Sequence, residues 1–204
     1  MYHVAAATGI NGFIGKHLFK RLLNEYDYVI SYLREGRCEI YDKNSSIVYL
    51  SHSYEIDKQY TPSVFYNLAT NYNPNPKNIQ DILTITESNI VFPLKILNKL
   101  KTPKIRFINF CSYLQLINTK ILSSYILSKD YLKTSVEPIV GNVSNVFLFD
   151  TFGNHDIRNK VVDVFIRKVL SKDVITIPIN EVKINLSEVS DICSSVSPMK
   201  KIPV

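Results

Sequence analysis

Apolar and polar positions alternate along this chain in a pattern that predicts strands followed by helices. A short apolar run at positions 4–7 has the length of a buried strand. After a turn, apolar side chains return every three or four residues, which is the spacing of one helix face: Ile14, Leu18, Leu22 and Leu23. The N-terminal segment is therefore predicted to form a strand, a turn and a helix.

The rest of the chain repeats this alternation. Apolar runs predict strands at 29–33, 47–50, 64–69, 105–110 and 143–149, with short late strands at 174–177 and 182–186. Helical spacing predicts helices at 89–100, 125–136 and 161–170, and we expect the last to bury Val161, Val164, Phe165 and one of Val169 and Leu170. Strands that alternate with helices predict a parallel sheet with helices on both faces.

The first turn carries the strongest local signal. Thr8 to Gly15 reads T-G-I-N-G-F-I-G, with glycine at every third position. A strand that reverses sharply into a helix needs backbone angles that glycine adopts, and a small third residue lets the helix lie close to the sheet. The free N–H groups at the helix start would receive a pyrophosphate. The stretch predicts the dinucleotide-binding turn of a Rossmann-type, doubly wound sheet. A glycine-rich turn in an unrelated α/β protein is the alternative.

A second pattern, Tyr-x-x-x-Lys, occurs at Tyr54–Lys58 and at Tyr125–Lys129. Residues four apart share one face of a helix. A lysine beside a phenol lowers the tyrosine pKa, so the phenol could exchange a proton with a carbonyl near neutral pH. The spacing also arises by chance in a chain rich in tyrosine and lysine. The position of each match relative to the predicted strands therefore decides which of the two belongs to a site. Nothing around Tyr54 indicates a site, whereas Tyr125 follows the strand that ends before Ser112.

Ser112 follows the apolar strand 105–110 directly. Sites in open parallel sheets lie beyond the carboxyl ends of the strands. We therefore expect Ser112 and Tyr125 to share a substrate oxygen. An ordinary loop hydroxyl is the alternative interpretation of Ser112.

These pieces, in this order, resemble the extended short-chain dehydrogenase/reductase family, which includes the NAD-dependent nucleotide-sugar epimerases, dehydratases and ketoreductases. The resemblance runs from Val4 to about Val196, and segments 67–97 and 149–160 are most similar to CDP-abequose and CDP-paratose synthases. It implies that Ser112, Tyr125 and Lys129 are catalytic. It also implies that the cofactor is bound by Thr8, Gly9, Asn11, Gly12, Phe13, Ile14, Gly15, Arg34, Leu68, Ala69, Thr70, Asn89, Tyr125 and Lys129.

The resemblance implies a reductase that transfers hydride from NADPH to a 4-keto deoxysugar nucleotide, in the synthesis of surface-polysaccharide (O-antigen) sugars. Tyr125 would protonate the alkoxide, Ser112 would polarise it, and Lys129 would hold the cofactor ribose. An epimerase or dehydratase of the same family, or a truncated non-catalytic cofactor binder, is the alternative. Arg34 lies where an arginine suits the 2′-phosphate of NADP and an acidic residue would suit NAD. NAD, with Arg34 as a surface side chain, stays open.

Three departures from the family pattern bear on activity. Only a short segment separates Ser112 from Tyr125, Phe147 stands where many relatives have arginine, and the chain ends at Val204. We therefore expect the C-terminal lobe that caps the sugar nucleotide to be reduced or missing. The expected division is an NAD(P)-binding Rossmann domain at 1–170 and a remnant of the substrate-binding region at 171–204.

Composition sets the remaining expectations. The 204 residues are enough for one domain with a substantial core, and the net charge of +6 is scattered, which suits small anionic ligands better than nucleic acid. The three cysteines and four histidines form neither a disulfide framework nor a metal motif, which indicates a reducing compartment. No segment has the pattern of a signal peptide or a membrane span. We expect a cytoplasmic protein without metal, nucleic-acid or membrane partners, and a possible homodimer through the helices that include the one bearing Tyr125.

Overall fold

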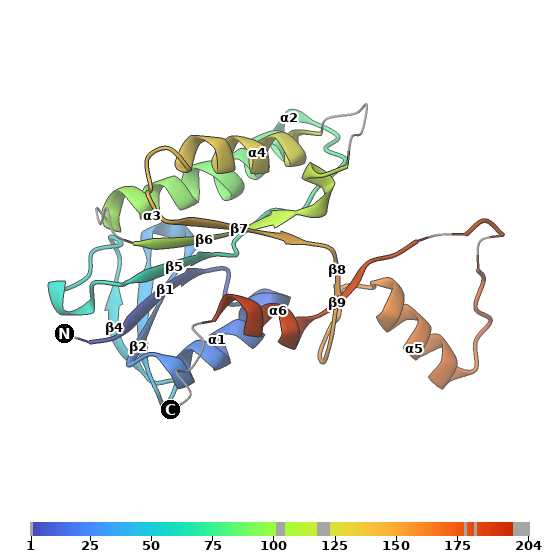
Figure 1. Ribbon diagram of the computed structural model, residues 1–204, viewed down its shortest axis with the longest axis horizontal. Helices are drawn as coiled ribbons and strands as arrows, with labels where there is room; N and C mark the ends of the chain where they lie inside the picture. Colours follow the sequence, from blue (N-terminus) through green and yellow to red (C-terminus); the bar gives the residue numbers. More distant parts are fainter. Residues whose placement is uncertain (1, 101–104, 118–122, 178, 182, 198–204) are drawn as a thin grey trace.

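The computed structural model describes residues 2–100, 105–117, 123–177, 179–181 and 183–197. Its centre is a seven-stranded sheet with strand order β4-β3-β2-β1-β5-β6-β7 (Figure 1). The strands are β1 (Val4–Thr8), β2 (Tyr28–Tyr32), β3 (Cys38–Asp42), β4 (Ile47–Ser51), β5 (Val64–Asn67), β6 (Arg106–Ser112) and β7 (Val143–Leu148). The predicted Rossmann-type sheet is confirmed. The expected strand positions agree with the observed ones to within about two residues for six of the seven strands, and β3 is the exception.

The sheet is mostly parallel, as predicted, and differs from the prediction at one edge. β1, β2, β5, β6 and β7 pair in parallel, but β3 pairs antiparallel with both β2 and β4. A tight turn joins β3 to β4, in which the Asp42 carboxylate accepts the amide N–H groups of Asn44 and Ser46. A hairpin therefore forms in the region of the expected third strand, and β3 was not predicted at all.

Helices cover both faces of the sheet (Figure 1). On one face lie α1 (Phe13–Glu25) and α6 (Val189–Val196), which pack against each other. On the other lie α2 (Ile79–Thr86), the π-helical turn η3 (Glu87–Val91), α3 (Phe92–Leu100) and α4 (Ser124–Val136). The run from α2 to α3 begins ten residues before the expected start at 89. Its π-helical turn buries the polar side chains of Ser88 and Asn89, as such turns often do at functional sites.

The first apolar run is continuous rather than alternating because both faces of β1 are covered by helices. Ala5 and Ala7 contribute to the core under α1 and α6, whereas Val4 and Ala6 contribute to the core under α3 and α4. All four side chains are buried because the strand lies in the middle of a sheet that is covered on both faces.

A row of polar side chains crosses four strands within this otherwise apolar sheet. The Thr8 hydroxyl donates to the Asn67 side-chain carbonyl at 3.0 Å. The amide of Asn67 donates to Asn109 at 3.1 Å, and that of Asn109 donates to Asn145 at 3.1 Å. The amide of Asn145 then donates to the Glu137 carboxylate at 2.7 Å. Each buried amide thus has a partner, as buried polar groups require.

The C-terminal part departs most from expectation. β8 (Asp150–Phe152) and β9 (Leu186–Glu188) form a separate two-stranded parallel sheet, and α5 (Val161–Ser171) projects beside it (Figure 1). The prediction that α5 buries one face is wrong, because none of its side chains is buried and Phe165, Val169 and Leu170 are exposed. No strand forms at 174–177. Of the strand expected at 182–186, position 182 lies outside the described residues and only Leu186 belongs to β9.

The proposed boundary at 170 stays a prediction. Cys193 and Val196 of α6 contribute to the same core as α1, so this segment packs on the sheet-bearing part of the chain. Among the described residues, no helix combines the length and the apolar character needed to cross a bilayer.

Candidate functional site

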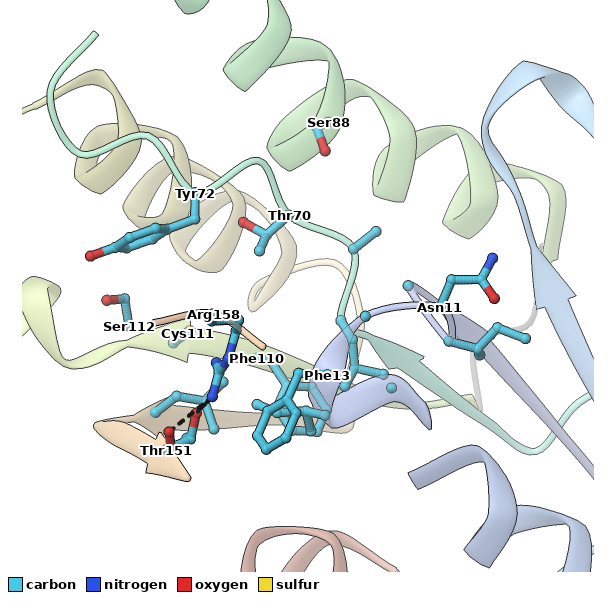
Figure 2. A pocket seen from close by; sticks show the side chains of 18 of the residues that line it. Asn11, Phe13, Thr70, Tyr72, Ser88, Phe110, Cys111, Ser112, Thr151 and Arg158 are labelled. Carbon is cyan, nitrogen blue, oxygen red and sulfur yellow. Dashed lines mark hydrogen bonds between the residues drawn. The ribbon is translucent and has the colours of Figure 1, made fainter. Parts of the chain in front are cut away.

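A cavity with a volume of ≈ 650 Å³ opens at the carboxyl ends of the parallel strands. Figure 2 shows its walls converging from the first turn, from the segment after β5 and from the ends of β6 and β7. Most of the predicted site residues line it: Gly9, Asn11, Gly12, Phe13, Ile14, Gly15, Arg34, Leu68, Ala69, Thr70, Ser112 and Tyr125. The structure therefore brings the predicted cofactor turn and the predicted reacting groups into one space.

Three predicted residues, Thr8, Asn89 and Lys129, are buried behind the cavity wall rather than in it. Thr8 accepts a hydrogen bond from the backbone N–H of Ala69 at 3.2 Å, and so fixes the segment after β5. These residues support the wall from behind. Whether any of them touches the cofactor stays a prediction.

The glycines of the first turn are required by space as well as by backbone angle. Gly9 has φ +72°, and a Cβ there would lie 2.6 Å from the Ala69 backbone nitrogen. A Cβ on Gly15 would lie 2.7 Å from the Ile10 Cα. The turn, the segment after β5 and the start of α1 are therefore in backbone contact, which leaves no room for side chains.

The start of α1 is open to an anion. Gly12 caps the helix without a side-chain hydrogen bond, and its first turn, all of it described, contains no acidic residue. The first N–H groups of a helix have no partner within the helix and carry a partial positive charge. Because Gly12 and Phe13 line the cavity, these groups are placed to receive the pyrophosphate of a dinucleotide.

Tyr125 and Ser112 form the polar centre of the cavity. Burial of Tyr125, which is only 4 % exposed, raises its pKa above the ordinary value, while hydrogen bonds with Ser112 and Thr70 lower it by less. The prediction of a lowered pKa is therefore wrong. The phenol is protonated at neutral pH and is placed to donate a proton.

Lys129 does not act on Tyr125 as the spacing suggested. Its ammonium donates to the backbone carbonyl of Phe110 at 2.9 Å, and burial lowers the pKa of Lys129 to about 8. Desolvation disfavours the charged form of a lysine. The ammonium thus supports β6, the strand that carries Ser112.

Asn89 positions the Thr70 hydroxyl, which forms a hydrogen bond with Tyr125. Its side-chain carbonyl accepts from the Thr70 hydroxyl at 3.1 Å and from the Asn71 backbone at 2.7 Å. Its amide donates to the Ser128 hydroxyl on α4 at 3.0 Å. Asn89 therefore fixes the segment after β5 to the helix that carries Tyr125, through the π-helical turn that buries it.

Ser112 is fixed by a capping box that the sequence analysis missed. Its hydroxyl accepts from the Leu114 N–H at 3.3 Å, and its own N–H donates to the Gln115 side chain at 2.8 Å. The Gln115 amide in turn donates to Asp130 of α4 at 2.7 Å. The spacing Ser-x-x-Gln is a recognisable signal for such a box and could have identified Gln115.

Aromatic side chains form the part of the cavity next to Tyr125. The Tyr72 ring meets the Tyr125 ring edge-on, with centroids 5.2 Å apart. Tyr113 stacks on Phe149, with centroids 5.6 Å apart. Lys160 also lines this end, where its ammonium lies 5.6 Å from the Tyr72 ring and pairs with Asp150 at 3.4 Å.

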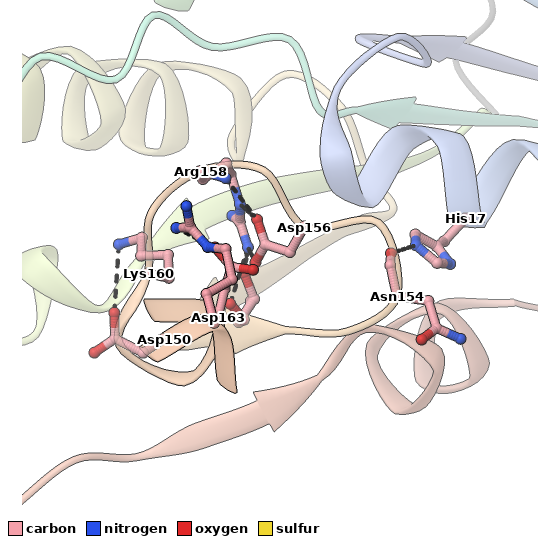
Figure 3. A network of polar contacts seen from close by, with 9 residues as sticks. His17, Asp150, Asn154, Asp156, Arg158, Lys160 and Asp163 are labelled. Carbon is pink, nitrogen blue, oxygen red and sulfur yellow. Dashed lines mark hydrogen bonds and ion pairs between the residues drawn. The ribbon is translucent and has the colours of Figure 1, made fainter. Parts of the chain in front are cut away.

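A second polar network adjoins the cavity wall (Figure 3). Arg158 donates to the Asp156 carboxylate through Nε and Nη2, each at 2.7 Å. The same Nη2 donates to the carbonyl and the hydroxyl of Thr151, both at 2.9 Å. This pairing lowers the pKa of Asp156, whose side chain is only 3 % exposed. No periodicity or motif in this loop indicates the network in advance.

The comparisons with known proteins agree with this geometry. Residues 5–192 match the model of the NAD dependent epimerase/dehydratase family. The chain belongs to this family. The match extends over nearly all of the described sheet and helices and includes Ser112, Tyr125 and Lys129. The chain is accordingly an NAD(P)-dependent enzyme of the oxidoreductase and epimerase type.

Individual relatives and solved structures are similar to this chain over most of its length. CDP-abequose synthase of Yersinia pseudotuberculosis is 28% identical over 201 residues, which cover 93% of this chain and 70% of that protein. UDP-glucose 4-epimerase of Thermotoga maritima superposes with a TM-score of 0.70 at 17% identity, covering 94% of this chain and 71% of the other. dTDP-4-dehydrorhamnose reductase of Bacillus anthracis, solved with NADP, has a TM-score of 0.66 at 14% identity and coverages of 96% and 69%.

Proposed function

We propose that the protein reduces a 4-keto deoxysugar nucleotide with NADPH, in the synthesis of a surface-polysaccharide sugar. The observation that carries the proposal is the placement of Tyr125 and Ser112 in the same cavity as the open helix start at Gly12. A proton donor and a dinucleotide site in one cavity are the minimum that a ketoreductase needs. The similarity to CDP-abequose synthase over 93% of the chain supports the substrate class.

The proposed chemistry follows from these side chains. The bound nicotinamide cofactor supplies the hydride that reaches C4 of the sugar. Tyr125 donates its phenolic proton to the oxygen as the alkoxide develops, and Ser112 donates a hydrogen bond to the same oxygen. Lys129, whose ammonium is bonded to the Phe110 carbonyl, would hold a ribose hydroxyl of the cofactor.

The cofactor choice rests on Arg34. This side chain lines the end of the cavity opposite Ser112, next to Tyr32 and Leu33 at the end of β2. An arginine at this position of a Rossmann sheet suits a 2′-phosphate, and a guanidinium binds phosphate through paired hydrogen bonds. We therefore propose NADP as the cofactor, with NAD as the alternative.

Lys160 and the aromatic side chains around Tyr125 support an anionic, ring-bearing substrate. The Lys160 ammonium is placed beside the Tyr72 ring and lines the cavity, so a phosphate could replace Asp150 as its partner. Tyr113 and Phe149 present flat apolar faces, which suit a sugar or a base.

An epimerase of the same family is the second candidate. The fold shared with UDP-glucose 4-epimerase favours it, because a Ser–Tyr pair that protonates an alkoxide can also remove the proton from an alcohol. The two reactions differ in cofactor use. A reductase consumes NADPH in proportion to product, whereas an epimerase returns its cofactor to the starting state.

The test is to mix the purified protein with NADPH and a 4-keto deoxysugar nucleotide, follow absorbance at the nicotinamide band, and identify the product by mass spectrometry. We expect oxidation of NADPH matched by a product two mass units heavier. Tyr125→Phe is the control and should bind NADPH without oxidising it. NADPH binding without turnover by the unaltered protein would refute the reductase and favour the non-catalytic binder. Isomerised sugar with no net NADPH loss would favour the epimerase.

We also propose a homodimer through α2 and α4. These adjacent helices expose Leu83, Leu127 and Tyr131 on their outer surface, at 55%, 49% and 54%. A second copy would cover this apolar face. Light scattering after size-exclusion chromatography should give twice the chain mass, and Leu127→Glu should give the monomer.

A further inference from the structure

The turn after β2 has an unusual backbone. The 3₁₀ turn η1 (Arg34–Gly36) joins β2 to β3, and within it Glu35 has φ 74° and Gly36 has φ 82°. Two consecutive residues with positive φ, one of them not glycine, form a conformation that isolated chains rarely adopt. Other contacts must therefore hold this turn in place.

Tyr54 supplies those contacts from a distant point of the chain. Its phenol donates to the carbonyl of Leu33 at 2.8 Å and accepts from the N–H of Gly36 at 3.0 Å. Its own backbone N–H donates to the carbonyl of Gly36 at 3.0 Å. The three bonds enclose Arg34 from both sides, so the backbone that carries the guanidinium is fixed on each side of it.

The Tyr54 ring also supports the same end of the cavity. It contacts Tyr32 edge-on, with centroids 5.8 Å apart, and Phe92 at 6.2 Å. Tyr32 and Phe92 both line the cavity, whereas Tyr54 lies behind them. Tyr54 therefore cannot touch a ligand directly, and any effect it has on binding acts through the residues in front of it.

Arg34 is available for a ligand. It lines the cavity and is exposed, and within the described part of the chain its guanidinium makes no hydrogen bond or ion pair. A surface arginine with such freedom normally loses much of its binding energy to the ordering of its side chain and backbone. A turn that is already fixed removes the backbone share of that loss.

We propose that Tyr54 is a positioning residue for cofactor selection. Its phenol holds the Leu33–Gly36 backbone so that Arg34 faces the 2′-phosphate of NADPH. This inference rests on the proposed function, specifically on NADPH as the cofactor and Arg34 as its phosphate ligand. It gives a role to the tyrosine of the Tyr54–Lys58 spacing, which the sequence alone left without one.

The variant Tyr54→Phe tests this directly, because it keeps the ring contacts and removes only the two hydrogen bonds of the phenol. Binding of NADPH and NADH to the full chain is measured by nucleotide fluorescence, with 2′,5′-ADP and 5′-AMP as competitors. We expect NADPH and 2′,5′-ADP to bind roughly tenfold more weakly, as the loss of one charge-assisted contact predicts. NADH and 5′-AMP should change by less than about twofold.

Tyr49→Phe is the matched control. Tyr49 lies on β4 of the neighbouring hairpin, and its phenol makes no hydrogen bond within the described residues, so both affinities should stay unchanged. Arg34→Gln should reduce the preference for NADPH at least as much as Tyr54→Phe does. Thermal melting of each variant confirms that it is folded.

The outcomes separate the two proposals. If the unaltered protein prefers NADH, or if Arg34→Gln leaves the preference for NADPH unchanged, the cofactor assignment fails and the role of Tyr54 falls with it. If Arg34→Gln removes the preference while Tyr54→Phe leaves it intact, only the role of Tyr54 is overturned. Equal weakening of NADPH and NADH by Tyr54→Phe would also overturn it, because a general support of the wall would act on both.

Discussion

The guanidinium carbon of Arg158 lies 4.0 Å from the centroid of the Phe13 ring. Phe13 is the first residue of α1, in the turn proposed to bind the cofactor, whereas Arg158 belongs to the loop after β8. The same guanidinium is bonded to Asp156 and Thr151. One side chain thus connects the turn at the start of the chain with the loop that covers the other end of the cavity.

We expect Arg158→Met to lower the free energy of unfolding by about 1–3 kcal/mol, because it leaves the buried Asp156 carboxylate without its partner. The pKa of Asp156 is lowered in the folded protein. Its pairing therefore contributes stability above the ordinary carboxyl pKa and loses it as pH falls through the lowered value. Urea unfolding at pH 7 and pH 3 measures both effects.

The double variant Asp156→Asn/Arg158→Met is the control for this pair. It removes the charge that Arg158→Met leaves unpaired and should recover part of the stability at pH 7. Equal stability of Arg158→Met and the unaltered protein would show that the network contributes nothing.

Gly15→Ala should destabilise the protein by about 3 kcal/mol or more, because the added methyl would overlap the Gly9 carbonyl and approach the Ile10 Cα to 2.7 Å. Gly141 offers a matched control, since a Cβ there has no neighbour within 4 Å. Gly141→Ala should leave the melting temperature within about 2 °C of the unaltered protein. Similar melting temperatures for both variants would contradict the close contact between α1 and the first turn.

The raised pKa of Tyr125 predicts that kcat for reduction is insensitive to pH across the neutral range. Burial raises the pKa of its phenol, so the proton-donating form is fully populated at pH 7 and is lost only above about pH 10. We expect kcat for reduction to be flat from pH 6 to pH 9 and to fall at higher pH. A fall centred near pH 7 would instead show that the bound cofactor lowers the phenol pKa.

The lowered pKa of Lys129 predicts that this residue contributes a rise in the free energy of unfolding above pH 8. Its pKa is lowered from 10.5 to about 8 in the folded chain. Below pH 8 the folded and unfolded states are both protonated, and the cost of burying the ammonium is fully present. Between pH 8 and about 10.5 only the unfolded state binds the proton, so the free energy of unfolding rises, by roughly 3 kcal/mol at most. The buried thiols of Cys38, Cys111 and Cys193, whose pKa is raised to about 11, oppose this rise above pH 9. In urea titrations from pH 7.5 to pH 9, the free energy of unfolding should therefore increase more in the unaltered protein than in Lys129→Met.

The sequence predicted those parts of the site that depend on local backbone demands. The glycines at 9, 12 and 15 are dictated by contacts within one turn and with the segment after β5, so their pattern alone predicted a turn that lines the cavity. Ser112 and Tyr125 could be placed together because parallel strands end at one edge of a sheet. Their catalytic roles stay predictions.

Other features depend on contacts that no local pattern contains. Periodicity shows that α5 has an apolar face but not what covers it, and Phe165 is exposed. The direction of β3 depends on the short turn at Arg34–Gly36, and that of β4 depends on the turn at Asp42. The apolar run at 47–50 is the same for either direction. The raised pKa of Tyr125 follows from its burial, which outweighs its hydrogen bonds with Ser112 and Thr70.

The row from Thr8 through Asn67, Asn109 and Asn145 has one further consequence. Neighbouring residues of a strand point to opposite faces, so a slip of one residue would move an amide away from its partners and leave buried polar groups unpaired. Only one alignment of β1, β5, β6 and β7 satisfies every member of the row. Polar side chains in the middle of the sheet thereby set the level at which the strands end, and with it the depth at which Ser112 meets a ligand.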